Sequence, residues 1–198
     1  MAVVRSKILV FPELCHSCGG CQLVCPKGAV NWHDRVIGKV EYGRVKSIDF
    51  YQGLLNIGEM QAIPVIKALK RKIDNSKNVV IDVPPGTSCP VIESINISDY
   101  CILVTEPTLF GFFDLKLAIE VVKHLNIPFG VIINRDGIGD NQVETFCQKE
   151  NIPILLKVPE RKKIAHLYSK GVTLVSESYE WHEMFGQLFN RIQEEVNK

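Results

Sequence analysis

The stretch Phe129-Gly-Val-Ile-Ile-Asn134 decides the fold class of this chain. It is apolar at nearly every position, and so are Tyr100-Cys-Ile-Leu-Val-Thr105 upstream and Ile152-Pro-Ile-Leu-Leu-Lys157 downstream. A strand with one face in water alternates apolar and polar residues, whereas a strand covered on both faces does not. We therefore expect these three runs to be strands of a parallel sheet.

Helical patterns alternate with these runs, at residues 115–125, 143–150, 162–169 and 179–196. Upstream, residues 78–83 form another short β-branched run that we expect to be a strand, and apolar residues recur at helical spacing across residues 60–73. Strands alternating with helices at this rhythm predict an α/β fold with a doubly wound, mostly parallel sheet.

The composition excludes several classes of protein. The chain has 198 residues, 46% of them hydrophobic, with 23 basic and 22 acidic side chains. This is too apolar for a disordered chain, and its longest apolar stretch, residues 100–113, is interrupted by Glu106. The balanced charge offers no field for nucleic acid or anionic lipid. Because the N-terminus also lacks a secretory signal pattern, we expect a cytoplasmic protein that binds neither nucleic acid nor membrane.

Cysteines give the strongest chemical signal in the sequence. Four of the seven lie within one short run, Cys15-x-x-Cys18-x-x-Cys21-x-x-x-Cys25-Pro26. An odd cysteine count packed this tightly favours a metal centre over disulfides. Zinc sites usually follow one Cys-x-x-Cys with a second pair, and none follows here. The run resembles bacterial-type ferredoxin domains, which implies a 4Fe-4S cluster held by these four thiolates.

The spacing leaves two arrangements open for the fourth ligand. In two-cluster ferredoxins the last cysteine of a run ligates the other cluster. Either Cys25 closes its own cluster, or a second cysteine motif lies before Met1. Cys89 is also followed by proline, but its place beside a Pro-Pro-Gly turn favours another role. Cys101 and Cys147 are expected to be buried, inert thiols.

The character of the sequence changes near residue 55. The earlier part holds the cysteines, several glycines and short β-like runs at residues 7–11 and 36–42. The later part holds the alternating strands and helices. We therefore expect a ferredoxin-like 4Fe-4S lobe in residues 1–55 and an α/β domain in residues 56–198.

Three further motifs carry a family resemblance, and they span the α/β domain. They are Ile81-Asp-Val-Pro-Pro-Gly-Thr-Ser-Cys-Pro90, Val104-Thr-Glu-Pro-Thr108, and Gly130-Val-Ile-Ile-Asn-Arg135 followed by Gly137-Ile-Gly-Asp140. Together with the cysteine run, they resemble the MinD/Mrp-type P-loop ATPases, most closely those with an inserted ferredoxin domain. The resemblance implies a P-loop NTPase-like fold that binds Mg-ATP.

The same resemblance implies three nucleotide-site residues. Asp82 would serve Mg²⁺, Gly86 would belong to the second switch, and Asn134 would touch the adenine. From the residues alone, an aspartate at a strand end and a turn glycine are also what ordinary turns use.

The chain departs from the family at the phosphate-binding loop. A Gly-x-x-x-x-Gly-Lys-[Ser/Thr] loop cradles phosphates with its backbone N–H groups, and no such motif occurs in the sequence. The sole Gly-Lys pair, Gly38-Lys39, is followed by Val40 and has His33 where the first glycine belongs. In the family this loop opens the protein, so we expect a chain that begins late. Apolar surface and unpaired strand edges would then be exposed, which predicts a homo-oligomer.

Three functions from different classes remain. The leading prediction is an iron–sulfur protein of the MinD/Mrp ATPase superfamily, with ATP-linked redox or iron–sulfur handling and a redox partner protein. The second is a non-enzymatic ferredoxin-like electron carrier or partner-binding module on a degenerate ATPase scaffold. The third is a zinc-stapled interaction protein.

Overall fold

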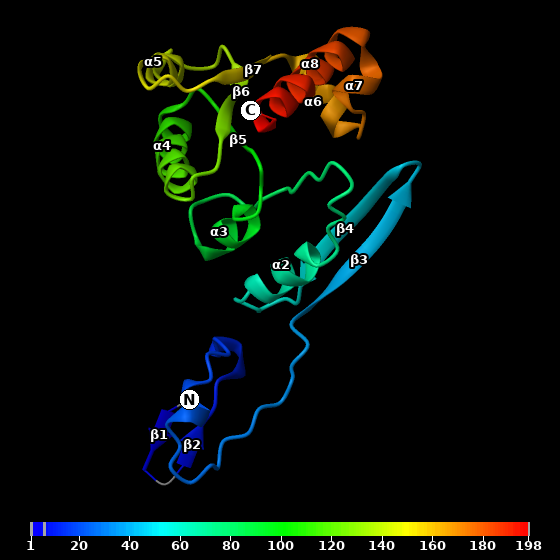
Figure 1. The fold of residues 1–198 in the computed structure, drawn as a ribbon. Helices are drawn as coiled ribbons and strands as arrows, with labels where there is room; N and C mark the ends of the chain where they lie inside the picture. The colour runs from blue at the N-terminus through cyan, green and yellow to red at the C-terminus, as the bar shows by residue number, and fades with distance from the viewer. Residues whose placement is uncertain (1, 6, 198) are drawn as a thin grey trace. The chain divides into compact units, whose positions relative to one another are not determined.

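The computed structural model describes residues 2–5 and 7–197 and divides the chain into two compact units (Figure 1). The first unit ends at Asp82 and the second begins at Val83. The boundary between the two compact units therefore lies after residue 55, the position at which the composition changes. Among the described residues, no helix is both long and apolar enough to cross a membrane.

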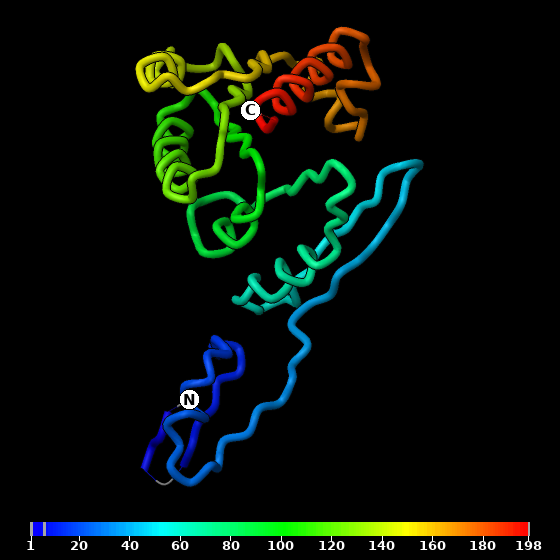
Figure 2. The backbone as a smooth tube through the Cα atoms, viewed as in Figure 1, coloured from blue at the N-terminus to red at the C-terminus, as the bar shows by residue number. Residues whose placement is uncertain are grey.

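The first unit is built from short elements. Strands β1 (Ala2–Val4) and β2 (Lys7–Leu9) pair antiparallel, and a 3-10 helix η1 (Pro12–Leu14) and helix α1 (Gly20–Leu23) follow. Figure 2 traces the segment from α1 to β3, which contains neither helix nor strand. Strands β3 (Gly38–Val45) and β4 (Ile48–Leu55) then form an antiparallel hairpin, and helix α2 (Ile63–Lys70) comes after it.

Helix α2 packs on the hairpin through strand positions that have no side chain. A Cβ at Gly53 would lie 2.5 Å from Val65 Cγ1 and 3.0 Å from Leu69 Cδ1, both on α2. A Cβ at Gly38 would likewise lie 3.1 Å from Val65 Cγ2. Because the helix approaches the hairpin backbone this closely, α2 belongs to the first unit and the compositional boundary falls inside that unit.

This close approach predicts that valine substitutions at two glycines of the hairpin have different effects on the stability of the first unit. Gly53→Val is expected to destabilise the first unit by about 1–3 kcal/mol, because its branched side chain would displace α2. Gly43→Val is the matched control, since a Cβ at Gly43 meets nothing within 4 Å and valine favours strands. Thermal unfolding followed by far-UV circular dichroism measures both. Equal effects of the two substitutions would contradict the packing of α2 on Gly53.

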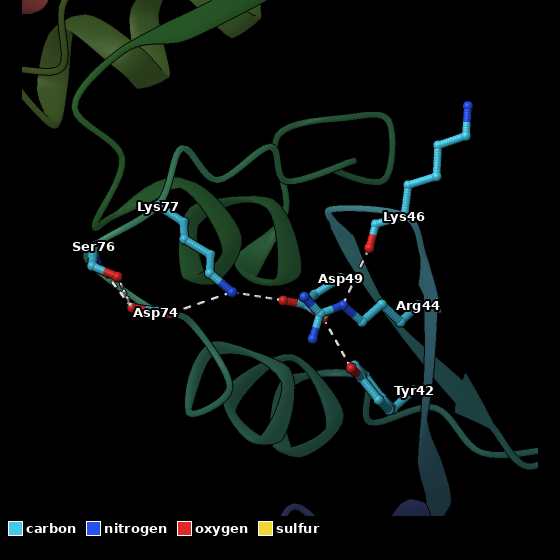
Figure 3. Close-up of polar contacts among 7 residues, drawn as sticks. All are labelled: Tyr42, Arg44, Lys46, Asp49, Asp74, Ser76 and Lys77. Atoms are coloured by element: carbon cyan, nitrogen blue, oxygen red, sulfur yellow. Dashed lines mark hydrogen bonds and ion pairs between the residues drawn. The ribbon is translucent and has the colours of Figure 1, made fainter.

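A polar network ties the segment after α2 to the hairpin (Figure 3). Lys77 Nζ lies 2.7 Å from one Asp49 carboxylate oxygen, and the Tyr42 hydroxyl donates to the other at 2.9 Å. Arg44 Nε lies 3.6 Å from the same carboxylate, and Lys77 also pairs with Asp74 at 3.6 Å. Lys77 and Tyr42 lower the pKa of Asp49 below its ordinary value of 3.8. The stability contributed by this pKa shift is therefore complete above that value and is lost as the pH falls below it.

The second unit is a three-stranded parallel sheet with helices on both faces. The strands are β5 (Cys101–Thr105), β6 (Phe129–Asp136) and β7 (Ile154–Pro159), in the order β5-β6-β7. The helices are α3 (Cys89–Ile95), α4 (Leu109–His124), α5 (Gln142–Lys149), α6 (Lys162–Ser169), α7 (Leu174–Glu177) and α8 (Tyr179–Val196).

Successive residues of β6 point into different clusters of the core. Val131 and Ile133 pack with buried residues of α4 and α5, among them Leu115 and Val143. Ile132, between them in sequence, packs with Leu188 of α8. Since neighbouring strand residues face opposite sides of a sheet, both sides of β6 are covered. This confirms the parallel, doubly wound architecture predicted from the apolar runs.

Two local predictions were wrong. Residues 78–83 form no strand, and within them Val79 and Val80 are exposed, because β-branched residues form a strand only beside a pairing neighbour. The helix expected from residue 115 begins at Leu109, because Thr108 caps it by accepting a hydrogen bond from Gly111 N at 3.1 Å. The hydrophobic pattern of the sequence also did not predict strand β4 or helix α3.

Candidate iron–sulfur site

The cysteine run lies in the first unit, before, within and after helix α1. Cys15 follows η1, and its N–H donates to the Pro12 carbonyl at 3.2 Å. Left-handed backbone at Ser17 (φ 51°) and Gly19 (φ 83°) then turns the chain into α1, which contains Cys21. Sequence positions 15–25 thus lie on a loop, one helical turn and a second loop.

Backbone N–H groups surround the last cysteine of the run. Ala29 N–H donates to Cys25 Sγ at 3.3 Å, after the chain has turned through Gly28 (φ 60°). The N–H groups of Ala29 and Lys27 lower the pKa of the Cys25 thiol. Such donors favour the thiolate, which is the form that ligates iron.

The glycines between the second and third cysteines have different roles. Gly19 is needed for its positive φ, which residues with a Cβ rarely adopt. At Gly20, a Cβ would lie 3.7 Å from Cys18 Sγ, which is an ordinary contact. Gly19 is therefore required for the backbone turn, whereas a Cβ at Gly20 would fit beside Cys18.

Four cysteine thiols are suitable ligands for an iron–sulfur cluster, but their sulfur atoms do not lie together in this structure. Three of the four cysteines are exposed and Cys25 is half-buried. Within the described part of the chain, no three His, Cys, Asp or Glu side chains lie close enough together to hold a metal ion. Metal binding and local ordering are coupled in small metal sites. We therefore expect the four sulfurs to converge as a cluster is assembled.

Two side-chain contacts hold the loop within the first unit. The Trp32 indole N–H donates to the Gln22 side chain of α1. His16 Nδ1 lies 2.9 Å from Gln61 Nε2, in the segment just before α2. Gln61 gives no sequence signal because it lies far along the chain from its partner.

An arginine makes a second connection between the same segments. Arg35 forms a two-pronged ion pair with Glu59, and its Nη2 lies 2.8 Å from Glu59 Oε2. The same Nη2 donates to the Pro12 carbonyl at 3.3 Å. Glu59 raises the pKa of Arg35, so the guanidinium stays charged. Both polar links join the cysteine loop to the segment that leads into α2.

The three cysteines outside the run differ from one another. Cys147 is completely buried in the core of the second unit, and burial raises the pKa of its thiol. Burial also raises the pKa of Cys101, which is half-buried in β5. Both are therefore poor thiolate donors. Cys89 is exposed at the first position of α3.

The structure places the predicted nucleotide residues in different settings. Asp82 is exposed and is the last residue of the first unit. Gly86 (φ 102°) lies in the turn before α3, and Asn134 is half-buried near the carboxyl end of β6. Gly86 and Asn134 thus belong to the second unit, while Asp82 does not.

An ion-pair cluster joins the carboxyl ends of the three strands of the second unit, and sequence reasoning missed it. Arg135 Nη1 lies 3.3 Å from Glu106, just after β5, and its Nε lies 2.9 Å from Glu160, just after β7. Doubly wound folds bind ligands at this edge of the sheet. By contrast, a cavity of about 530 Å³ opens among residues of the other edge, including Phe129 and Pro153.

Comparison with known proteins supports both parts of the chain. Residues 8–31, which contain all four cysteines of the run, match the 4Fe-4S binding domain family. An uncharacterized protein of Methanocaldococcus jannaschii is 29% identical over 197 residues, covering 98% of this chain and 65% of the relative. An iron-sulfur cluster carrier protein of Rickettsia conorii is 31% identical over 110 residues, covering 53% of this chain and 34% of the relative. The chain spans between about a third and two thirds of these relatives.

Solved structures with a similar fold are MinD proteins. The cell division ATPase MinD of Pyrococcus furiosus aligns with a TM-score of 0.50 and 26% identity, covering 67% of this chain and 57% of that one. The MinD cell division protein of Aquifex aeolicus aligns with a TM-score of 0.54, covering 71% of this chain and 64% of that one; at 18% identity it supports the fold alone. The 4Fe-4S domain match, the cluster-carrier relatives and the MinD-like fold together support the resemblance of this chain to the MinD/Mrp-type P-loop ATPases with a ferredoxin domain.

Proposed function

We propose that the first unit binds one 4Fe-4S cluster through Cys15, Cys18, Cys21 and Cys25. The observation that carries this proposal is the 4Fe-4S domain match, which spans all four cysteines. The N–H donors around Cys25 and the turn at Gly19 support it. A bound cluster supplies one-electron redox chemistry, and the four thiolates with their N–H donors set its potential.

The physiological role that best fits these ligands is electron transfer or iron–sulfur handling with a redox partner protein. Iron–sulfur handling is favoured by the cluster-carrier relatives, which align with the chain over about half its length. In family members this work would be linked to Mg-ATP, with Asp82, Gly86 and Asn134 as the nucleotide residues. The 198-residue sequence contains no Gly-x-x-x-x-Gly-Lys-[Ser/Thr] motif that could cradle the phosphates.

The missing phosphate motif favours a second candidate function. A chain that holds a cluster but has no phosphate cradle would act as a non-enzymatic electron carrier or partner-binding module on an ATPase-like scaffold. The two functions share the cluster and differ in nucleotide binding, so a single preparation of the protein can distinguish them.

Anaerobic reconstitution with iron and sulfide tests the cluster first. We expect a brown protein with about four irons and four sulfides per chain and visible absorbance that bleaches on dithionite. A colourless protein that takes up one zinc and no iron would contradict the proposal and support the alternative of a zinc-stapled interaction protein.

Calorimetric titration of the reconstituted chain with Mg-ATP then separates the two functions. We expect no measurable binding, because the backbone cradle for the phosphates is missing from the sequence. Micromolar binding that is lost in Asp82→Ala would contradict this expectation and favour the ATP-linked role. Binding that is unchanged in Asp82→Ala would contradict the role assigned to Asp82.

A further inference from the structure

One turn of the chain fixes the backbone around Arg35. The turn covers residues 56–59, just after β4. Asn56 N–H donates to the Ile37 carbonyl at 2.8 Å, and the Asn56 side chain donates to the Val36 carbonyl at 3.0 Å. These two bonds hold the residues that directly follow Arg35, in a segment that has neither helix nor strand.

The same turn fixes the side chain of Arg35. Glu59 forms the two-pronged ion pair with the guanidinium, and its own N–H donates to the Asn56 carbonyl at 3.1 Å. The Glu59 side chain is only 8% exposed, whereas that of Arg35 is 39% exposed. A nearly buried carboxylate needs a charged partner, and Arg35 supplies it. Arg35 is therefore anchored both through its backbone neighbours and through its side chain.

The guanidinium reaches from this anchor to the first cysteine of the run. Arg35 Nη2 donates to the Pro12 carbonyl at 3.3 Å, and Cys15 N–H donates to the same oxygen at 3.2 Å. A carbonyl oxygen has two lone pairs, so it can accept both bonds. The hydrogen bond with Glu59 contributes most to the raised pKa of Arg35, and the charge of a Cys15 thiolate contributes a smaller part. The charged side chain thus lies within electrostatic reach of the Cys15 thiolate.

We propose that Arg35 is a positioning residue for the 4Fe-4S cluster: anchored by Glu59, it fixes the turn that presents Cys15 and keeps a positive charge beside that thiolate. The inference rests on the proposed cluster, with Cys15 as one of its ligands. Reduction by a one-electron donor adds one negative charge to a cluster and its thiolates. A fixed cation nearby stabilises the reduced form more than the oxidised form, and Arg35 therefore raises the reduction potential.

Redox titration of the reconstituted full chain tests the charge of Arg35, with dithionite supplying the electron. Arg35→Gln removes the charge, so the ratio of oxidised to reduced cluster at the wild-type midpoint potential is expected to rise about threefold or more. Arg35→Lys retains the charge, and its ratio is expected to stay within about twofold of wild type. A purely structural role of Arg35 would not separate the two variants in this way.

Arg44→Gln is the matched control, because it removes the same charge from the same unit. Arg44 also pairs with a carboxylate, that of Asp49, and also donates to a backbone carbonyl at 3.3 Å, that of Lys46. Both partners lie in the β3–β4 hairpin and not in the cysteine run. The reduction potential is therefore expected to be unchanged in Arg44→Gln.

Iron release to a chelator tests the geometry of the contact. Arg35→Gln alone leaves the nearly buried Glu59 carboxylate without its partner, which costs stability. The double variant Arg35→Gln/Glu59→Gln avoids this cost, because it replaces both charged groups with amides. It loses the ion pair that holds the side chain on the Pro12 carbonyl, and it is expected to release iron about threefold faster than wild type, or more. Arg44→Gln is expected to release iron at the wild-type rate, and circular dichroism checks that each variant is folded.

Results that contradict the inference are distinct from those that contradict the proposed function. A brown wild-type protein whose potential is unchanged in folded Arg35→Gln would overturn the inference alone. An equal shift of the potential in Arg35→Lys or in Arg44→Gln would do the same, as would iron release from the double variant at the wild-type rate. A wild-type chain that binds no iron would overturn the proposed function, and the inference with it.

Discussion

Cys18→Ala is expected to abolish the iron–sulfur cluster and to reduce bound iron from about four atoms per chain to nearly none. Cys18 lies in the middle of the run, exposed and next to the left-handed turn at Gly19. Removing one thiolate leaves one iron of the cluster without its protein ligand, which destabilises the whole cluster. Iron and sulfide analysis after anaerobic reconstitution, together with visible absorbance, measures the loss.

Cys89→Ala is the matched control for this substitution. Cys89 is exposed like Cys18 but lies at the start of α3, in the second unit. It is expected to retain the full iron content. Equal iron loss in both variants would place Cys89 among the ligands and contradict a site made from the cysteine run alone.

Cys25→Ala separates the two arrangements that the spacing leaves open. Complete loss of iron would mean that Cys25 closes the same cluster as the three preceding cysteines. Retention of iron in Cys25→Ala would mean that its thiolate serves a different cluster or partner.

The largest stability effect is expected from Ile133→Ala, at about 2–5 kcal/mol. Ile133 has no exposed surface and packs among Leu115, Val143 and Cys147, between the sheet and helices α4 and α5. Truncation removes buried methylene and methyl groups and leaves a cavity that the surrounding strands and helices cannot fill without moving.

Urea unfolding followed at one tryptophan measures this effect in the second unit alone. The chain has two tryptophans, and Trp181 lies in α8 of the second unit. A Trp32→Phe background therefore leaves Trp181 as the only reporter. Val104→Ala is the control, because Val104 in β5 is 63% exposed and should cost under about 1 kcal/mol. Similar costs for the two substitutions would contradict the placement of Ile133 in the core.

Much of the fold of the second unit could be predicted from local sequence. The runs at residues 100–105, 129–134 and 152–157 are apolar enough to identify buried parallel strands without any knowledge of their neighbours. Residues 78–83 have the same β-branched character but form no strand. The difference lies in pairing, which depends on distant residues that a local pattern does not contain.

The candidate site also has one part that the local sequence predicts and another that depends on residues far apart in the chain. Cysteine spacing predicts the ligands, because the Cys-x-x-Cys-x-x-Cys pattern is typical of thiolates that bind one small cluster. The contacts that hold the cysteine loop, Arg35 with Glu59 and His16 with Gln61, join segments more than 20 residues apart and have no motif. The cluster of Arg135, Glu106 and Glu160 exists only because three strands end at one edge of a sheet.

The sequence by itself determined the chemistry of the cysteine loop, the α/β class and the family resemblance, because each depends on residue types within short windows. Tertiary structure alone decided that the first compact unit ends at Asp82, since α2 closes on the glycines of the hairpin. It also decided which side of α4 stays exposed. An apolar helix has no inner or outer face in its sequence, and only packing against Val131 and Ile133 leaves Phe110 and Phe113 facing outward.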